Sequence, residues 1–161
     1  EYVSKNESSQ FFDSKDNVII ELKAENFDNI FLINVTSDSF PVVSIDLNLL
    51  KMFREKRLSG TIYPYVISIY DLLVLSDLIE TPEDLIDYLK QRIEISKTYE
   101  LKSGDELDFL GYFLSHGSLN STEDIKDVKH PIIHGYSEDI DKWYLYLDGE
   151  IESATKPTRK K

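Results

Sequence analysis

The chain has 161 residues, of which 41% are hydrophobic, enough for a folded core in one domain or two small lobes. Its 30 acidic and 18 basic residues give a formal net charge of -12, which disfavours contact with nucleic-acid phosphates and anionic membranes. The absence of cysteine excludes disulfides, thiolate zinc sites and cysteine catalysis, and it suits a cytoplasmic protein. No apolar run approaches the roughly 20 residues that a membrane helix needs.

The first half of the chain predicts strands. Phe11 and Phe12 precede the turn-forming residues 13–17 and the strand-like residues 18–23, which is the pattern of a β-hairpin. Residues 30–36 are almost continuously apolar and predict a central strand that is buried on both faces. A helix is predicted over residues 47–58, with a cluster of basic side chains. The strand predicted over residues 62–67 contains Pro64, which confines it to an edge or makes its first part irregular.

Two helix-start signals follow. Ser68, with Asp71 three residues later, predicts the N-cap of a helix that is apolar over most of its girth and is expected to be buried. Thr81, followed by a proline and two acids, predicts the start of the next helix. One apolar stripe of this second helix should pack on the first, through Leu85, Leu89 and Ile93 against Leu72 and Leu75.

Two more helices are expected near the C-terminus. Ser103 and Glu106 fit a capping box, and Gly117 is the expected stop of that helix. Capping and the helix dipole explain the acidic residues at its start, which are Asp105, Glu106 and Asp108. Ser137 predicts the start of the last helix.

These elements predict an α+β fold, in which a small sheet of two to four strands from the N-terminal half is covered by four or five helices. We expect a single domain over residues 11–150. Residues 1–10 are interpreted as a linker or cut end, and residues 151–161 as a polar tail or linker that includes the basic Arg159. Such polar ends indicate a piece of a longer polypeptide.

The sharpest enzymatic pattern is Glu21 and Lys23, which strand alternation places on one face. An acid, one spacer and a lysine on a strand are used by nucleases that bind Mg²⁺ and position the attacking water. Asp13 or Asp16 could serve as the second metal-binding acid, but both sit in the turn just before the strand, closer to it than is usual in such motifs. The alternative is a solvated strand face.

Aromatic residues near the C-terminus form the second candidate site. Tyr136, Trp143 and Tyr146 are interpreted as contacts for another domain or a protein partner, with core packing as the alternative. The three histidines show no spacing typical of a metal site, so we expect neither a metal nor a cofactor site.

Several of these segments together resemble a protein family. They are residues 33–36, 65–72, 82–92, 105–108 and 135–141. This ordered set is similar to the middle-to-C-terminal region of large, mostly uncharacterised bacterial proteins. Those carry a restriction-endonuclease-like domain, of PD-(D/E)XK or NERD-like type, at their N-terminus. The resemblance covers most of residues 17–160. It implies that the nuclease motif lies upstream and that Glu21 and Lys23 are not catalytic.

The sequence therefore favours a non-catalytic accessory or interaction domain of a larger bacterial protein, associated with a nuclease-like domain. Two alternatives stay open. One is a divergent Mg²⁺-dependent PD-(D/E)XK-like nuclease that uses Glu21 and Lys23, and the other is a free-standing acidic protein-binding module.

Overall fold

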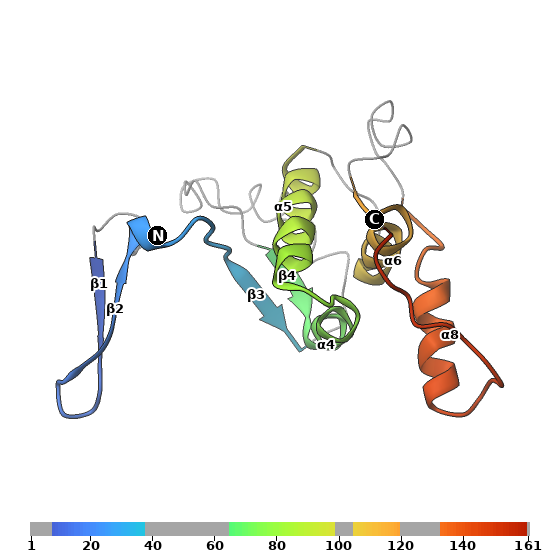
Figure 1. The fold of residues 1–161 in the computed structure, drawn as a ribbon, viewed down its shortest axis with the longest axis horizontal. Coiled ribbons are helices and arrows are strands. Elements are labelled where there is room, and N and C mark those ends of the chain that lie inside the picture. The colour runs from blue at the N-terminus through green and yellow to red at the C-terminus, as the bar shows by residue number, and fades with distance from the viewer. Residues whose placement is uncertain (1–7, 38–64, 99–104, 120–132, 161) are drawn as a thin grey trace.

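The computed structural model describes residues 8–37, 65–98, 105–119 and 133–160. Within these residues the fold is α+β, with four α-helices and two separate two-stranded sheets, which confirms the predicted class (Figure 1). The strands are β1 (Ser8–Phe12), β2 (Val18–Lys23), β3 (Ile33–Thr36) and β4 (Tyr65–Ser68), with a short 3-10 helix η1 (Ala24–Asn26) after β2. The helices are α4 (Ile69–Leu78), α5 (Pro82–Thr98), α6 (Glu106–His116) and α8 (Glu138–Leu147).

The antiparallel hairpin β1–β2 lies at one end of the long axis of the molecule, and α8 lies at the other (Figure 1). The predicted turn between β1 and β2 is present and depends on Asp13. The Asp13 carboxylate accepts hydrogen bonds from the backbone N–H of Lys15 at 2.7 Å and of Asn17 at 2.9 Å, and from the Asn17 side chain at 3.0 Å. These hydrogen bonds lower the pKa of Asp13, with the largest effect from Asn17 and a smaller one from Lys15.

The second sheet pairs β3 with β4 in parallel, from Ile33 opposite Tyr65 to Thr36 opposite Ser68. The prediction that β3 is buried on both faces is wrong, because the side chains of Ile33 and Val35 are 40% and 44% exposed. Among the described strands β3 pairs only with β4, and all four residues of β4 are buried. The apolar run identified a strand correctly but could not indicate which strand the helices cover.

The starts of α4 and α5 are as predicted. The Ser68 hydroxyl accepts the N–H of Asp71 at 3.0 Å and donates to the Asp71 carboxylate at 2.7 Å. The Thr81 hydroxyl makes the same pair of bonds to Asp84, at 3.1 Å and 2.8 Å. Each cap satisfies a backbone N–H that the first helical turn leaves without a partner.

The core lies among the four helices and β4. Leu75, Leu89 and Ile93 are buried in one cluster with the inner face of α6 and with Ile140 of α8, and Leu72 and Leu85 pack at its margin. This confirms the predicted stripe of α5. The prediction that α4 is buried holds for one side only: Leu75 and Leu78 are buried, but Tyr70 and Leu73 are 62% and 61% exposed on its outer side.

The predicted cap of α6 also requires correction. The N-cap is Asp105, whose carboxylate accepts the N–H of Leu107 at 2.9 Å, and Ser103 lies outside the described residues. Glu106 is the first helical residue, and its carboxylate turns into the core instead of capping the helix. Gly117 ends α6 in the left-handed conformation with φ of 77°, as its sequence position predicts.

The helix and basic cluster predicted over residues 47–58 also lie outside the described residues. Among the helices that the structure describes, none has both the length and the apolar character needed to cross a membrane.

Candidate functional site

The hairpin places Glu21 and Lys23 on one exposed face of β2, opposite Gln10 and Ser8 of β1. Among the described residues, no second acid joins them in the arrangement that nuclease chemistry needs. Asp13 is held in the turn by its own hydrogen bonds, several residues along the strand from Glu21. In the described ranges, no three aspartate, glutamate or histidine side chains are arranged to hold a metal ion.

The opposite face of the same hairpin is apolar. Phe11 of β1 lies directly across from Ile20 of β2, and their side chains are 51% and 52% exposed. A two-stranded hairpin is marginally stable in water unless another element covers its apolar face. The exposed large apolar residues of the hairpin and of the chain just after it are Phe11, Phe12, Val18, Ile19, Ile20, Phe27, Ile30 and Leu32. Of these, Phe11 and Ile20 lie on the face opposite Glu21, whereas Phe12, two positions after Gln10 on β1, lies on the same side as Glu21.

The aromatic candidates near the C-terminus separate into two groups. Tyr136 packs edge-on to Tyr112, with ring centroids 4.8 Å apart, and belongs to the margin of the core. Trp143 also packs against the core, and its indole N–H is buried without an acceptor among the described residues. Tyr146, 5.6 Å from Trp143 between ring centroids, is 39% exposed, next to the exposed Leu147. Contact of these residues with a partner stays a prediction.

The sequence reasoning missed a buried polar network, which we call the Glu106 network and which consists of Tyr65, Tyr88, Arg92 and Glu106. Glu106 accepts hydrogen bonds from the Tyr65 hydroxyl at 2.6 Å, from the Tyr88 hydroxyl, and from Arg92 Nη2 at 2.9 Å. All four side chains are at most 4% exposed, and the Arg92 guanidinium lies 4.0 Å from the centre of the Phe109 ring.

Burial, reinforced by the negative charge of Glu106, raises the pKa of Tyr65 and of Tyr88 well above the usual range. Burial is the largest single effect on Arg92 and opposes its charged form, but the charge and hydrogen bonds of Glu106, together with the charges of Tyr88 and Tyr65, outweigh it and raise the pKa of the guanidinium. Because solvent does not reach these groups, the arrangement holds β4, α5 and α6 together and offers no place for a substrate. No single residue in the sequence signals it, since its members are up to 41 positions apart.

A second buried acid, Asp108, organises the start of α8. Its Oδ1 accepts the N–H groups of Tyr136 at 2.8 Å and Ser137 at 3.0 Å, so it caps the following helix and not its own. Gly111, about one turn further along α6, lies against the backbone of Tyr136. A Cβ added to Gly111 would stand only 1.9 Å from the Tyr136 carbonyl oxygen. The dipole of α6, which the sequence suggests as the reason for the acidic residue Asp108, is therefore an incomplete explanation.

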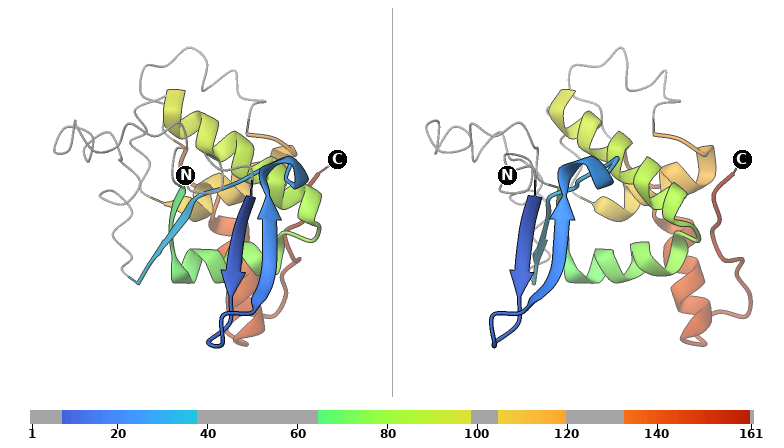
Figure 2. Two further views of the ribbon diagram at one scale, coloured as in Figure 1. Left: turned by 90° about the vertical axis from the view of Figure 1, so that its left-hand side faces the viewer. Right: turned by 60° about the vertical axis from the view of Figure 1, so that its left-hand side comes forward.

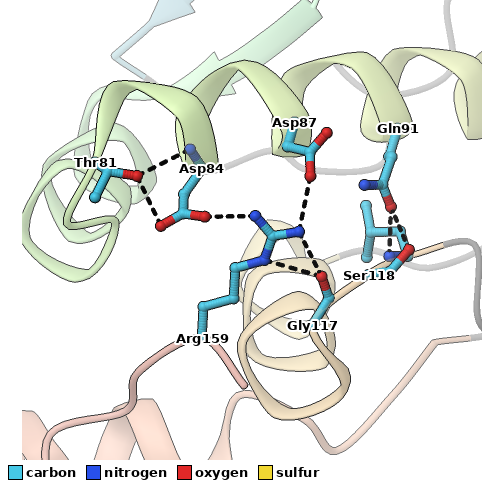
Figure 3. Close-up of polar contacts among 8 residues, drawn as sticks. Thr81, Asp84, Asp87, Gln91, Gly117, Ser118 and Arg159 are labelled. Atoms are coloured by element: carbon cyan, nitrogen blue, oxygen red, sulfur yellow. Dashed lines mark hydrogen bonds and ion pairs between the residues drawn. The ribbon is translucent and has the colours of Figure 1, made fainter. Parts of the chain in front are cut away.

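The C-terminal segment (residues 151–160) forms no helix or strand, yet the side chains of Lys156 and Arg159 are bound to the helices. Arg159 reaches between α5 and the end of α6, where it pairs with Asp84 and with Asp87 at 2.7 Å (Figure 3). Its Nε and Nη2 also donate to the carbonyl oxygen of Gly117, at 2.9 Å and 2.7 Å. A lone arginine in a polar stretch gives no signal in the sequence that it is bound in this way.

No protein-family model, curated protein or solved structure matches this chain. The resemblance to nuclease-linked bacterial proteins stays a prediction.

Proposed function

We propose that this chain is a non-catalytic interaction domain that binds a protein surface through the apolar face of the β1–β2 hairpin. The partner is another domain of the same, longer polypeptide or a separate protein. The observation that supports this proposal most directly is the pair Phe11 and Ile20, which face each other across the hairpin with about half of each side chain in water.

The hairpin exposes a large apolar area to water. Water-exposed apolar surface costs free energy, and contiguous patches of it are typical of interaction sites. Because the hairpin has only two strands among the described residues, its outer edges also offer unpaired backbone N–H and C=O groups. A partner that adds a strand at such an edge would satisfy these groups and cover the apolar face together.

The charge of the chain favours a different molecule over a second copy. Two chains that each carry a formal net charge of -12 repel one another at moderate ionic strength. We therefore propose a partner surface that is apolar at its centre and neutral or basic at its rim.

The nuclease alternative uses the other face of the same hairpin, which carries Glu21 and Lys23. We expect the chain alone not to cleave DNA or RNA with Mg²⁺ or Mn²⁺. Metal-dependent cleavage that is lost in both Glu21→Gln and Lys23→Ala would replace our proposal with the nuclease.

Site-specific photo-crosslinking in cells that express the natural protein tests the proposal. A photo-reactive amino acid replaces Ile20 on the apolar face in one variant and Glu21 on the polar face in the other. We expect position 20 to capture one defined protein, or another domain of the same polypeptide, and position 21 to capture little of it. Absence of an adduct at position 20, or equal adducts from both faces, would contradict the proposal.

A further inference from the structure

A cavity of about 500 Å³, partly open to solvent, lies between α6, α8 and the C-terminal segment. Leu114 and Ser115 of α6 and Ile140 of α8 form its inner walls. Residues 153–158 and Lys160 form its outer wall. The C-terminal segment runs back beside α8 toward the end of α6, as the views of Figure 2 show.

This outer wall is attached mainly through polar contacts. Lys156 donates to the backbone carbonyl of Asp77 at 2.9 Å, and the backbone N–H of Lys160 donates to the carbonyl of Leu114 at 2.9 Å. The strongest attachment is Arg159, which binds two carboxylates of α5 and the carbonyl of Gly117 and lies 4.4 Å from the centre of the Phe113 ring. Hydrogen bonds between charged groups are stronger than those between neutral groups. The planar, forked guanidinium of arginine has the geometry to donate several of them at once.

The inner walls are held differently. Leu114 and Ile140 are 2% and 1% exposed and belong to the apolar core, whereas the side chains of residues 153–160 are half-buried or exposed. Segments with few buried apolar contacts open at a lower free energy than the core does. The outer wall therefore has the physical properties of a part that moves separately from the helices.

We propose that residues 153–160 form a strap, latched by Arg159, that closes the cavity between α6 and α8 and releases while the helices stay folded. Release breaks the two ion pairs with α5, the bonds from Arg159 to Gly117 and from Lys156 to Asp77, and the bond from the Lys160 N–H to Leu114. It gives solvent and ligands access to the wall formed by Leu114 and Ile140. The close fit at Gly117 supports a specific seat, because a Cβ there would lie 2.5 Å from the carbonyl oxygen of Lys160.

Hydrogen–deuterium exchange on the whole chain tests the latch. Arg159→Gln should raise the exchange rate of the Lys160 amide at least tenfold after correction for intrinsic rates, while the amides of Phe109 and Phe113 stay protected. Lys160→Gln removes the same charge from an exposed neighbour and should change that rate less than threefold. Asp84→Asn combined with Asp87→Asn should reproduce the effect of Arg159→Gln from the side of α5.

Thiol labelling tests whether the strap closes the cavity, since the chain has no natural cysteine. Leu114→Cys places a thiol on the inner wall, and Arg159→Gln should speed its reaction with a maleimide at least tenfold over Leu114→Cys alone. Unchanged exchange and labelling in the Arg159 variants would overturn the proposal. Equal loss of protection in the segment and in α6 would also overturn it, because the segment would then be an integral part of the fold.

Discussion

Replacing Arg92 with methionine tests whether the Glu106 network holds the fold together. The substitution keeps much of the side-chain volume but removes the bonds that Arg92 Nε and Nη2 donate to Glu106, the shortest at 2.9 Å. Glu106 is 3% exposed and would keep only the two tyrosine hydroxyls among the donors described here. Breaking a buried ion pair on one side typically costs about 3–5 kcal/mol, because it leaves a charge without compensation.

Urea unfolding followed by the fluorescence of Trp143 measures this loss as a shift in the midpoint at constant slope. Arg92→Met should lose about 3–5 kcal/mol, and the double variant with Glu106→Leu should recover part of it, because no unpaired charge remains. Lys90→Met, on the exposed side of the same helix, is the control and should stay within about 0.5 kcal/mol of the natural chain. A loss below about 1 kcal/mol in Arg92→Met would refute the reasoning.

Three further predictions concern stability. Leu89 is 4% exposed, so Leu89→Ala should cost about 2–5 kcal/mol in the same assay, and a loss under about 0.5 kcal/mol would mean that α5 presents another face to the core. Gly111→Ala should cost about 1–3 kcal/mol or more through its clash with Tyr136, whereas an unobstructed helix would gain about 1 kcal/mol from the same change. Because the folded pKa values of Tyr65 and Tyr88 are raised, stability should be intact below about pH 10 and fall above it, by about 1.4 kcal/mol per pH unit for each tyrosine. Tyr88→Phe should flatten that alkaline decline, and an unchanged slope would count against the effect.

Local signals in the sequence were read correctly where the physical cause is also local. Ser68 and Thr81 cap helices through bonds to residues three positions away, and Gly117 ends a helix through its own backbone conformation. The turn at Asp13 belongs to the same class. These features depend on a few consecutive residues, so the sequence contains all that is needed to predict them.

The remaining features depend on partners far along the chain. Glu106 matched a capping box three residues after Ser103, but its carboxylate binds Arg92 and two tyrosines instead. Burial of a strand depends on what covers it, so the apolar pattern of β3 could not indicate that Ile33 is exposed. A polar tail gave no sign of its contacts with α5 and α6. The exposure of the apolar side chains of the hairpin also depends on what covers them, so the sequence did not indicate it.

The most direct test of the interaction proposal is the affinity of the chain for the purified partner that crosslinking identifies, measured by calorimetry. About half of Phe11 and of Ile20 is exposed, so covering these exposed parts should contribute roughly 1.5–3 kcal/mol to binding for the two residues together. That free energy corresponds to about a 10- to 150-fold change in Kd. Phe11→Ser with Ile20→Ser should weaken binding by that factor, while Gln10→Ser with Glu21→Ser on the polar face should leave Kd within about threefold. Hydrogen exchange of the hairpin should confirm that both variants keep its strands paired. Equal weakening by the two variants, or none by the first, would contradict the proposed interface.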